Sequence, residues 1–143
     1  EKRREGATDR ASFKNFSFNF DSAAGIIYTV DVTKPKGEKV TITSMADGTP
    51  FSLDKMYKVA LNSYRGNGGG ELLTKGSGIS QDELKDRILY STDKDLRYYL
   101  MQYIEKKGVI EPHALGLWKF IPEEWVEPAA KRDYEYLFGK VEK

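Results

Sequence analysis

The residues best suited to recognise a ligand lie between Asn62 and Glu71, in the stretch NSYRGNGGGE. Four of the five positions from 66 to 70, called the glycine loop below, are glycine and cannot form a regular element. Successive backbone N–H groups without Cβ atoms can approach a ligand closely or surround an anion. The spacing matches neither a P-loop nor a GxGxxG turn. A mobile surface loop is the alternative interpretation.

Tyr64 and Arg65 precede this loop directly. An aromatic side chain at such a position can stack on a planar ligand such as a base. An arginine beside it could bind a phosphate or carboxylate with two parallel hydrogen bonds. The competing interpretation is a core tyrosine with its hydroxyl at the rim and an arginine that is simply solvated.

Composition excludes several other chemistries. His113 is the single histidine and the chain has no cysteine, so thiolate zinc sites and cysteine nucleophiles are excluded. A zinc enzyme usually needs two or three histidines. The net charge of +1 gives no electrostatic footprint for duplex nucleic acid. No apolar run approaches the 18 or so residues of a membrane span, so no span is expected.

The surrounding elements change from period two to period 3.6 along the chain. Phe16, Phe18 and Phe20 alternate with polar residues and predict an extended segment. Strands are expected at residues 26–32, 40–45, 56–61 and 115–120, the first three as an antiparallel meander. Ser80 and Glu83 form a capping box. Longer helices are expected at residues 92–107 and 128–138.

This order predicts an α+β fold with an antiparallel or mixed β-sheet and helices packed on it. At 143 residues the chain is expected to form a single domain, with residues 1–12 as a flexible tail. A tyrosine stripe at helical spacing is expected to lie in the core: Tyr98, Tyr99 and Tyr103. Pro128 is expected at the first turn of the last helix.

Three segments occur in this order: DSAAGIIYTVD at 21–31, PKGEKV at 35–40 leading to DGTP at 47–50, and YKVALNSYRGNGG at 57–69. Together they resemble the C-terminal domain of the 5′-nucleotidase family. DLRYYLMQYI at 95–104 is similar to the closing helix of that domain. The resemblance covers about residues 20–121. The family includes UDP-sugar hydrolases and 2′,3′-cyclic-nucleotide phosphodiesterase/3′-nucleotidases.

The resemblance implies a nucleotide-recognition role. In family members a separate metallophosphoesterase domain holds two divalent metals, and two aromatics sandwich the base. Tyr64 matches one of these aromatics. The nucleotide-binding residues that the resemblance suggests are Asn62, Tyr64, Arg65, Asn67, Gly68, Gly69 and Gly70. We therefore expect no catalytic residue, metal or cofactor in this chain, and a metallophosphoesterase domain or chain as its partner. Export to the periplasm or cell surface is a further implication.

The chain departs from the family pattern in ways that leave alternatives open. The metal ligands, the front half of the domain and its second aromatic have no counterpart, and Gly70 stands where many members have an aspartate. A non-catalytic surface or interaction domain that lost nucleotide binding is the main alternative. A sugar-binding module is a weaker one, which needs Trp118 and Trp125 exposed on one face. Any uncovered edge is expected to be covered by a second copy, in a homodimer, or by the last helix.

Overall fold

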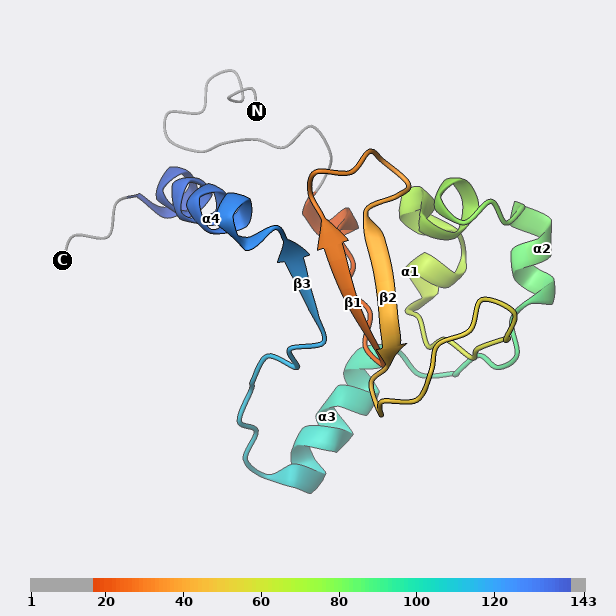
Figure 1. Ribbon diagram of the computed structural model, residues 1–143. Coiled ribbons are helices and arrows are strands. Elements are labelled where there is room, and N and C mark those ends of the chain that lie inside the picture. Colours follow the sequence, from red (N-terminus) through yellow and green to blue (C-terminus); the bar gives the residue numbers. More distant parts are fainter. Residues whose placement is uncertain (1–16, 140–143) are drawn as a thin grey trace, which may run out of the picture. The chain divides into compact units, whose positions relative to one another are not determined.

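The computed structural model describes residues 17–139, except for the side chains of residues 17, 136 and 137. The chain groups into two compact units (Figure 1). Of the described residues, one unit takes in 17–54 and 114–139, and the other takes in Lys55–His113. The expectation of a single domain stays a prediction. The proposed tail at 1–12 and Phe16 lie outside the described residues.

The first unit is built on a three-stranded mixed sheet. Its strands are β1 (Ile26–Asp31), β2 (Val40–Met45) and β3 (Trp118–Ile121), in the order β2-β1-β3. β1 pairs with β2 in the antiparallel sense and with β3 in the parallel sense. Together with the helices, this confirms the predicted α+β class.

One face of this sheet carries an aromatic cluster. Tyr28 on β1 lies opposite Trp118 on β3 and Ile42 on β2. The Tyr28 and Trp118 rings stack with centroids 5.9 Å apart, and Tyr28 is only 8% exposed. Phe120 meets Trp118 edge-on at 5.1 Å, and Phe20 lies 5.8 Å from Trp118. Tyr28 is the buried member of this cluster, Trp118 and Phe120 are partly exposed, and Phe20 lies at its exposed edge.

The segment before β1 differs from the sequence-based prediction. Ser17–Asn19 forms a 3₁₀ turn, η1, so the expected extended segment is wrong over the described residues. Serine and asparagine favour local hydrogen bonding over a strand ladder. Phe20 nevertheless contacts the aromatic cluster, because the turn delivers its ring to the sheet face.

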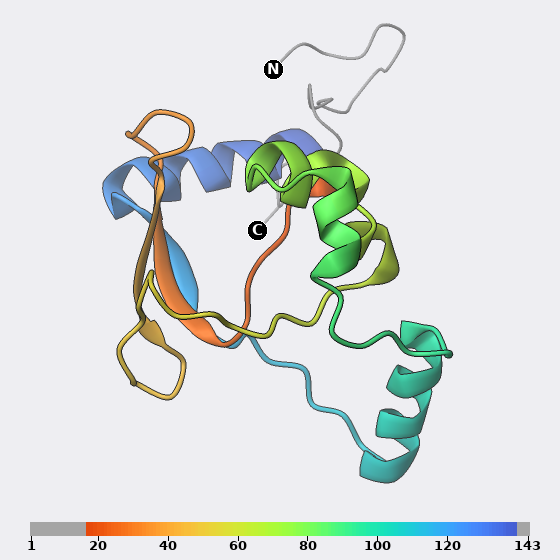
Figure 2. The same cartoon turned by 90° about the vertical axis from the view of Figure 1, so that its right-hand side faces the viewer.

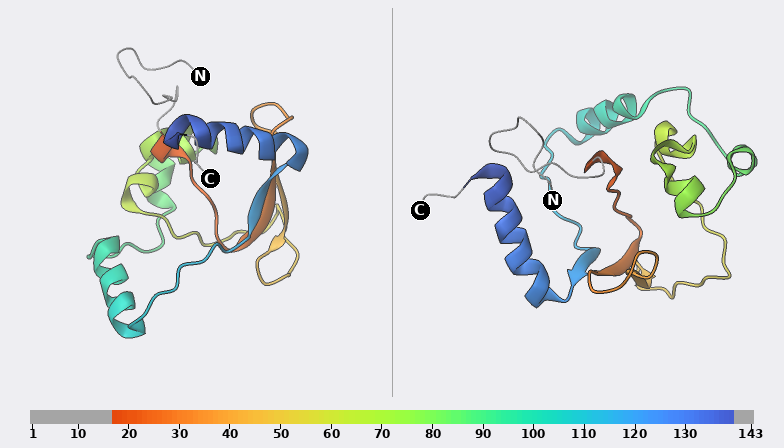
Figure 3. Two further views of the ribbon diagram at one scale, coloured as in Figure 1. Left: turned by 90° about the vertical axis from the view of Figure 1, so that its left-hand side faces the viewer. Right: turned by 90° about the horizontal axis from the view of Figure 1, so that it is seen from above.

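The last helix, α4 (Glu123–Phe138), begins five residues earlier than expected. Pro122 stands at its N-cap and its carbonyl accepts from the N–H of Trp125 and of Val126, both at 3.2 Å. Glu123 and Glu124 in the first turn complement the helix dipole. Pro128 therefore lies inside the helix, not at its first position. α4 follows β3 directly, contacts that strand and leads away from its end (Figures 1 and 3).

The second unit consists of short helical turns and one longer helix. They are α1 (Ser63–Gly66), η2 (Gly69–Glu71), η3 (Leu72–Gly76), α2 (Gln81–Asp86) and α3 (Leu96–Lys107). The strand predicted at 56–61 is wrong, because this segment has no regular structure. β-branched and apolar residues form a strand only where a neighbouring strand offers a ladder.

Helix caps follow the sequence closely in this unit. The Ser80 hydroxyl accepts from the Glu83 N–H at 3.3 Å, and the Asp95 carboxylate accepts from the Tyr98 N–H at 3.0 Å. The second cap explains why α3 begins at residue 96 and not at 92. The helix ends at Lys107, as predicted, with Gly108 at its C-cap.

The predicted burial of the tyrosine stripe on α3 is wrong. α3 contains no buried residue, and its tyrosines and leucines are all exposed. Within its unit, α3 lies away from α1 and α2 in every view (Figures 1, 2 and 3). Helical periodicity indicates which face is apolar but not whether anything covers it. Between residues 17 and 139, no helix has the length and hydropathy that crossing a bilayer requires.

Candidate functional site

Asn62 organises the turn that carries Tyr64. The Asn62 side-chain oxygen accepts from the Arg65 N–H at 2.8 Å, which caps the four-residue helix α1. The Gly66 N–H donates to the Asn62 carbonyl at 2.9 Å and closes the turn. The expectation that residues 66–70 have no regular structure is thus only partly right, since Gly66 ends α1 and Gly69 begins η2.

The glycines of the loop have conformational and steric reasons to be glycine. Gly68 and Gly70 have φ of +87° and +68°, in the left-handed region that other residues rarely adopt. A Cβ on Gly69 would lie 2.5 Å from the Tyr64 carbonyl oxygen and 2.6 Å from atoms of the Tyr64 ring. The backbone of Gly69 therefore packs against Tyr64 at a distance that no side chain permits.

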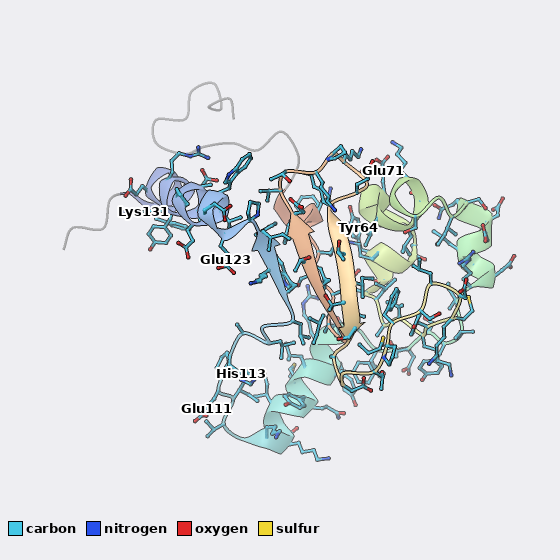
Figure 4. The ribbon with its side chains drawn as sticks, in the orientation of Figure 1. Tyr64, Glu71, Glu111, His113, Glu123 and Lys131 are labelled. Carbon is cyan, nitrogen blue, oxygen red and sulfur yellow. The ribbon has the colours of Figure 1, made fainter. Side chains whose placement is uncertain are left out.

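Tyr64 is half-exposed, with 51% of its surface accessible (Figure 4). Gly69 lies against its ring, and the guanidinium carbon of Arg65 lies 5.2 Å from the ring centroid. The tyrosine is thus neither a core residue nor a freely moving surface residue. It presents a ring that its neighbours hold in place and solvent still reaches.

Arg65 is placed differently from a solvated arginine. It is 4% exposed, and its Nη1 donates to the Gly69 carbonyl at 3.1 Å. Its guanidinium therefore lies within the turn formed by α1 and η2. This hydrogen bond joins Arg65, which follows Tyr64 in the sequence, to Gly69 in the glycine loop.

Two residues of α2 support the loop and were not found by sequence reasoning. The Gln81 Nε2 donates to the Asn67 carbonyl at 3.0 Å, across fourteen residues of sequence. Leu84, only 5% exposed, lies with Gln81 next to Gly68. The capping box at Ser80 locates α2, but nothing in the local pattern indicates that α2 packs on the glycine loop.

The charged groups whose pKa values shift lie outside this loop. A hydrogen bond and ion pair from Arg87 lower the pKa of Glu83 below its ordinary value. Lys119 lowers the pKa of Glu123 in the same way, and hydrogen bonds from Thr33 lower the pKa of Asp31. These are surface contacts that favour the charged carboxylate, so they indicate no general acid or base.

Metal ligation finds no support in the described part of the chain. Within residues 17–139 no three histidine, aspartate or glutamate side chains gather as metal ligands would. His113 lies in the segment between α3 and β3, where its Nδ1 is 3.3 Å from the Glu111 carbonyl oxygen (Figure 4). No metal-dependent step is therefore assigned to these residues.

The two tryptophans do not form a sugar platform. Trp118 is stacked on Tyr28 within the aromatic cluster of the sheet, whereas Trp125 on α4 is 60% exposed. A sugar-binding module would need both indoles exposed on one face, and this condition is not met because Trp118 is only partly exposed and stacks on Tyr28.

Comparison with known sequences identifies the class of domain. The family model for the 5′-nucleotidase C-terminal domain matches residues 4–75, which is half of the chain and includes the whole glycine loop. The chain belongs to this family, as its sequence resemblance predicted.

Two curated relatives place the chain more closely. It is 31% identical over 121 residues to the trifunctional nucleotide phosphoesterase protein YfkN of Bacillus subtilis (strain 168). It is 29% identical over 121 residues to a 2′,3′-cyclic-nucleotide 2′-phosphodiesterase/3′-nucleotidase of Haemophilus influenzae (strain ATCC 51907 / DSM 11121 / KW20 / Rd). These matches cover 76% and 74% of this chain, but only 8% and 17% of the relatives. No solved structure matches the chain.

Proposed function

We propose that this chain is the nucleotide-recognition part of a 5′-nucleotidase-like phosphoesterase and is not a catalyst by itself. The observation that carries the proposal is the half-exposed Tyr64 ring, packed on Gly69, the second of the paired glycines. Membership of the 5′-nucleotidase C-terminal domain family and similarity to two nucleotide phosphoesterases support it.

In this proposal Tyr64 stacks on the base and the glycine loop brings its backbone close to the ligand. Stacking on an aromatic ring tolerates every base, because each base has a π-face. Asn67 is exposed and can add a polar contact with its side chain. Asn62 acts through the helix cap that orients Tyr64.

Calorimetric titration of the chain with adenosine, AMP and a 2′,3′-cyclic nucleotide tests the proposal. Tyr64→Ala is expected to weaken binding by about 1–3 kcal/mol, the usual contribution of a stacked base. Tyr103→Ala is the matched control, because Tyr103 on α3 is 54% exposed, close to the 51% of Tyr64. The control variant is expected to bind like the unaltered chain.

The alternative function is an interaction domain that kept the fold and lost nucleotide binding. Two observations favour it: Gly70 replaces the aspartate expected after the paired glycines, and α3 exposes its whole apolar face. Absence of heat with all three ligands, or equal binding by Tyr64→Ala, would favour this alternative over nucleotide recognition.

In this proposal a partner domain or chain carries out the hydrolysis. A metallophosphoesterase domain or a separate chain would supply the divalent metals and the attacking water, since the described residues offer no ligand set for them. We also propose a periplasmic or cell-surface location, from family membership. Fractionation of cells that make the intact protein, with an antibody to this segment, tests the location.

A further inference from the structure

Arg65 is buried, whereas an arginine that binds a ligand from the surface stays exposed. In the part of the chain that the structure describes, it is the only charged residue that is buried. Burial of a guanidinium is costly unless hydrogen bonds compensate for the lost water. The Arg65 Nη1 donates to the Gly69 carbonyl at 3.1 Å, so part of this compensation comes from the glycine loop itself.

The same guanidinium also lies next to the stacking tyrosine. Its central carbon is 5.2 Å from the Tyr64 ring centroid, within the range of a cation–π interaction. Gly69, which accepts the hydrogen bond from Arg65, also packs against the Tyr64 ring. The buried Arg65 side chain therefore contacts both Tyr64 and Gly69, the residue that packs on the Tyr64 ring.

We propose that Arg65 is a positioning residue that holds Tyr64 and Gly69 in register, and that it does not contact the phosphate of the ligand. The inference rests on the proposed nucleotide recognition and assigns Arg65 a role different from direct ligand contact. A lysine cannot take this role, because its point charge lacks the planar fork of donors that can stack on the ring and reach the carbonyl together.

Two ligands that differ only in a phosphate separate positioning from contact. Arg65→Lys and Arg65→Met are titrated with adenosine and with AMP in the full chain. A positioning role predicts that both affinities fall by the same factor, on the order of tenfold, since the lost interaction is base stacking. A fall for AMP alone, with adenosine unchanged, would identify Arg65 as a phosphate contact and overturn the proposal.

Hydrogen exchange measured without ligand tests the positioning role of Arg65 separately from the proposed nucleotide recognition. The Glu71 N–H donates to the Gly68 carbonyl at 3.2 Å, so its hydrogen exchange reports on the order of the loop. In Arg65→Lys we expect faster exchange at Glu71 and shifted Tyr64 ring resonances. If the unaltered chain binds neither ligand, the proposed function fails, while this measurement still decides the positioning role.

Arg97→Met is the matched control, because Arg97 lies in the same unit with its side chain 89% exposed. It is expected to leave the Glu71 exchange rate and both affinities unchanged. Unchanged hydrogen exchange of the Arg87 N–H, which donates to the Glu83 carbonyl at the end of α2 in the same unit, shows that each variant keeps its fold. Exchange and ring resonances in Arg65→Lys that equal those of the unaltered chain would overturn the proposal.

Discussion

At the scale of single residues, the glycine loop is shaped by contacts that need no ligand. Gly69 is compressed against Tyr64, and Gly68 and Gly70 adopt left-handed backbone conformations. Glu71 shares that conformation with a φ of +60°, although it carries a side chain. Backbone conformation and close packing are thus enough to explain the glycines of the loop. The feature that points to a ligand is the exposed ring of Tyr64.

Gly69→Ala is expected to destabilise the second unit by about 1–3 kcal/mol, the usual cost of forcing an extra methyl into a packed site. The new Cβ would lie 2.5 Å from the Tyr64 carbonyl oxygen, which is backbone and cannot move aside cheaply. Urea denaturation measures the effect. Gly66→Ala is the matched control, because a Cβ there meets nothing within 4 Å. Equal stability of the two variants would contradict the packing described for Tyr64.

At the scale of elements, local signals were predictable from the sequence and non-local contacts were not. β1, β2 and the cap at Ser80 depend on neighbouring residues, and the sequence located each of them to within a few positions. The strand expected at 56–61 needs a partner strand that no local pattern identifies. The same holds for the candidate site: Tyr64 was found by its position, but no local pattern indicates the hydrogen bond from Gln81 to Asn67 or the burial of Arg65.

The ion pair on α2 gives a pH-dependent prediction at this scale. Arg87 holds the pKa of Glu83 below its ordinary value. Because the folded-state pKa is the lower one, the pair stabilises α2 above the unfolded-state pKa and loses this effect as the pH falls through the folded-state value. Arg87→Ala is expected to raise the Glu83 pKa towards its ordinary value, as followed by NMR of the carboxyl carbon.

The control for that titration is Arg97→Ala, which removes an exposed arginine from α3 instead of α2. It should leave the Glu83 titration unchanged. An unaltered Glu83 midpoint in Arg87→Ala would show that the pair, with Nη2 and Oε1 2.5 Å apart, does not persist in solution.

At the scale of the whole molecule, burial is concentrated at a few positions. Among the described residues, the buried apolar side chains are Tyr28 in the first unit and Leu84 in the second. The apolar side chains of α3 contribute little to either core. Stability of each unit therefore depends on few residues, and large effects of substitution are expected only there.

Leu84→Ala is expected to destabilise the chain by about 2–5 kcal/mol, the usual range for a buried leucine. Leu100→Ala is the matched control, because Leu100 on α3 is 55% exposed and its truncation removes little packing. Chemical denaturation of both variants checks the difference. A loss for Leu100→Ala as large as that for Leu84→Ala would mean that α3 is packed in solution.

The parallel pairing of β1 with β3 has a consequence for the order of assembly. β1 and β2 are joined by a short connection, whereas the whole second unit lies in the sequence between β1 and its parallel partner β3. The entropy lost in closing a loop grows with its length, so the hairpin can form long before β3 joins it. During synthesis, the open side of β1 therefore stays available until the ribosome has released Ile121, and the stacking of Trp118 on Tyr28 is a late event.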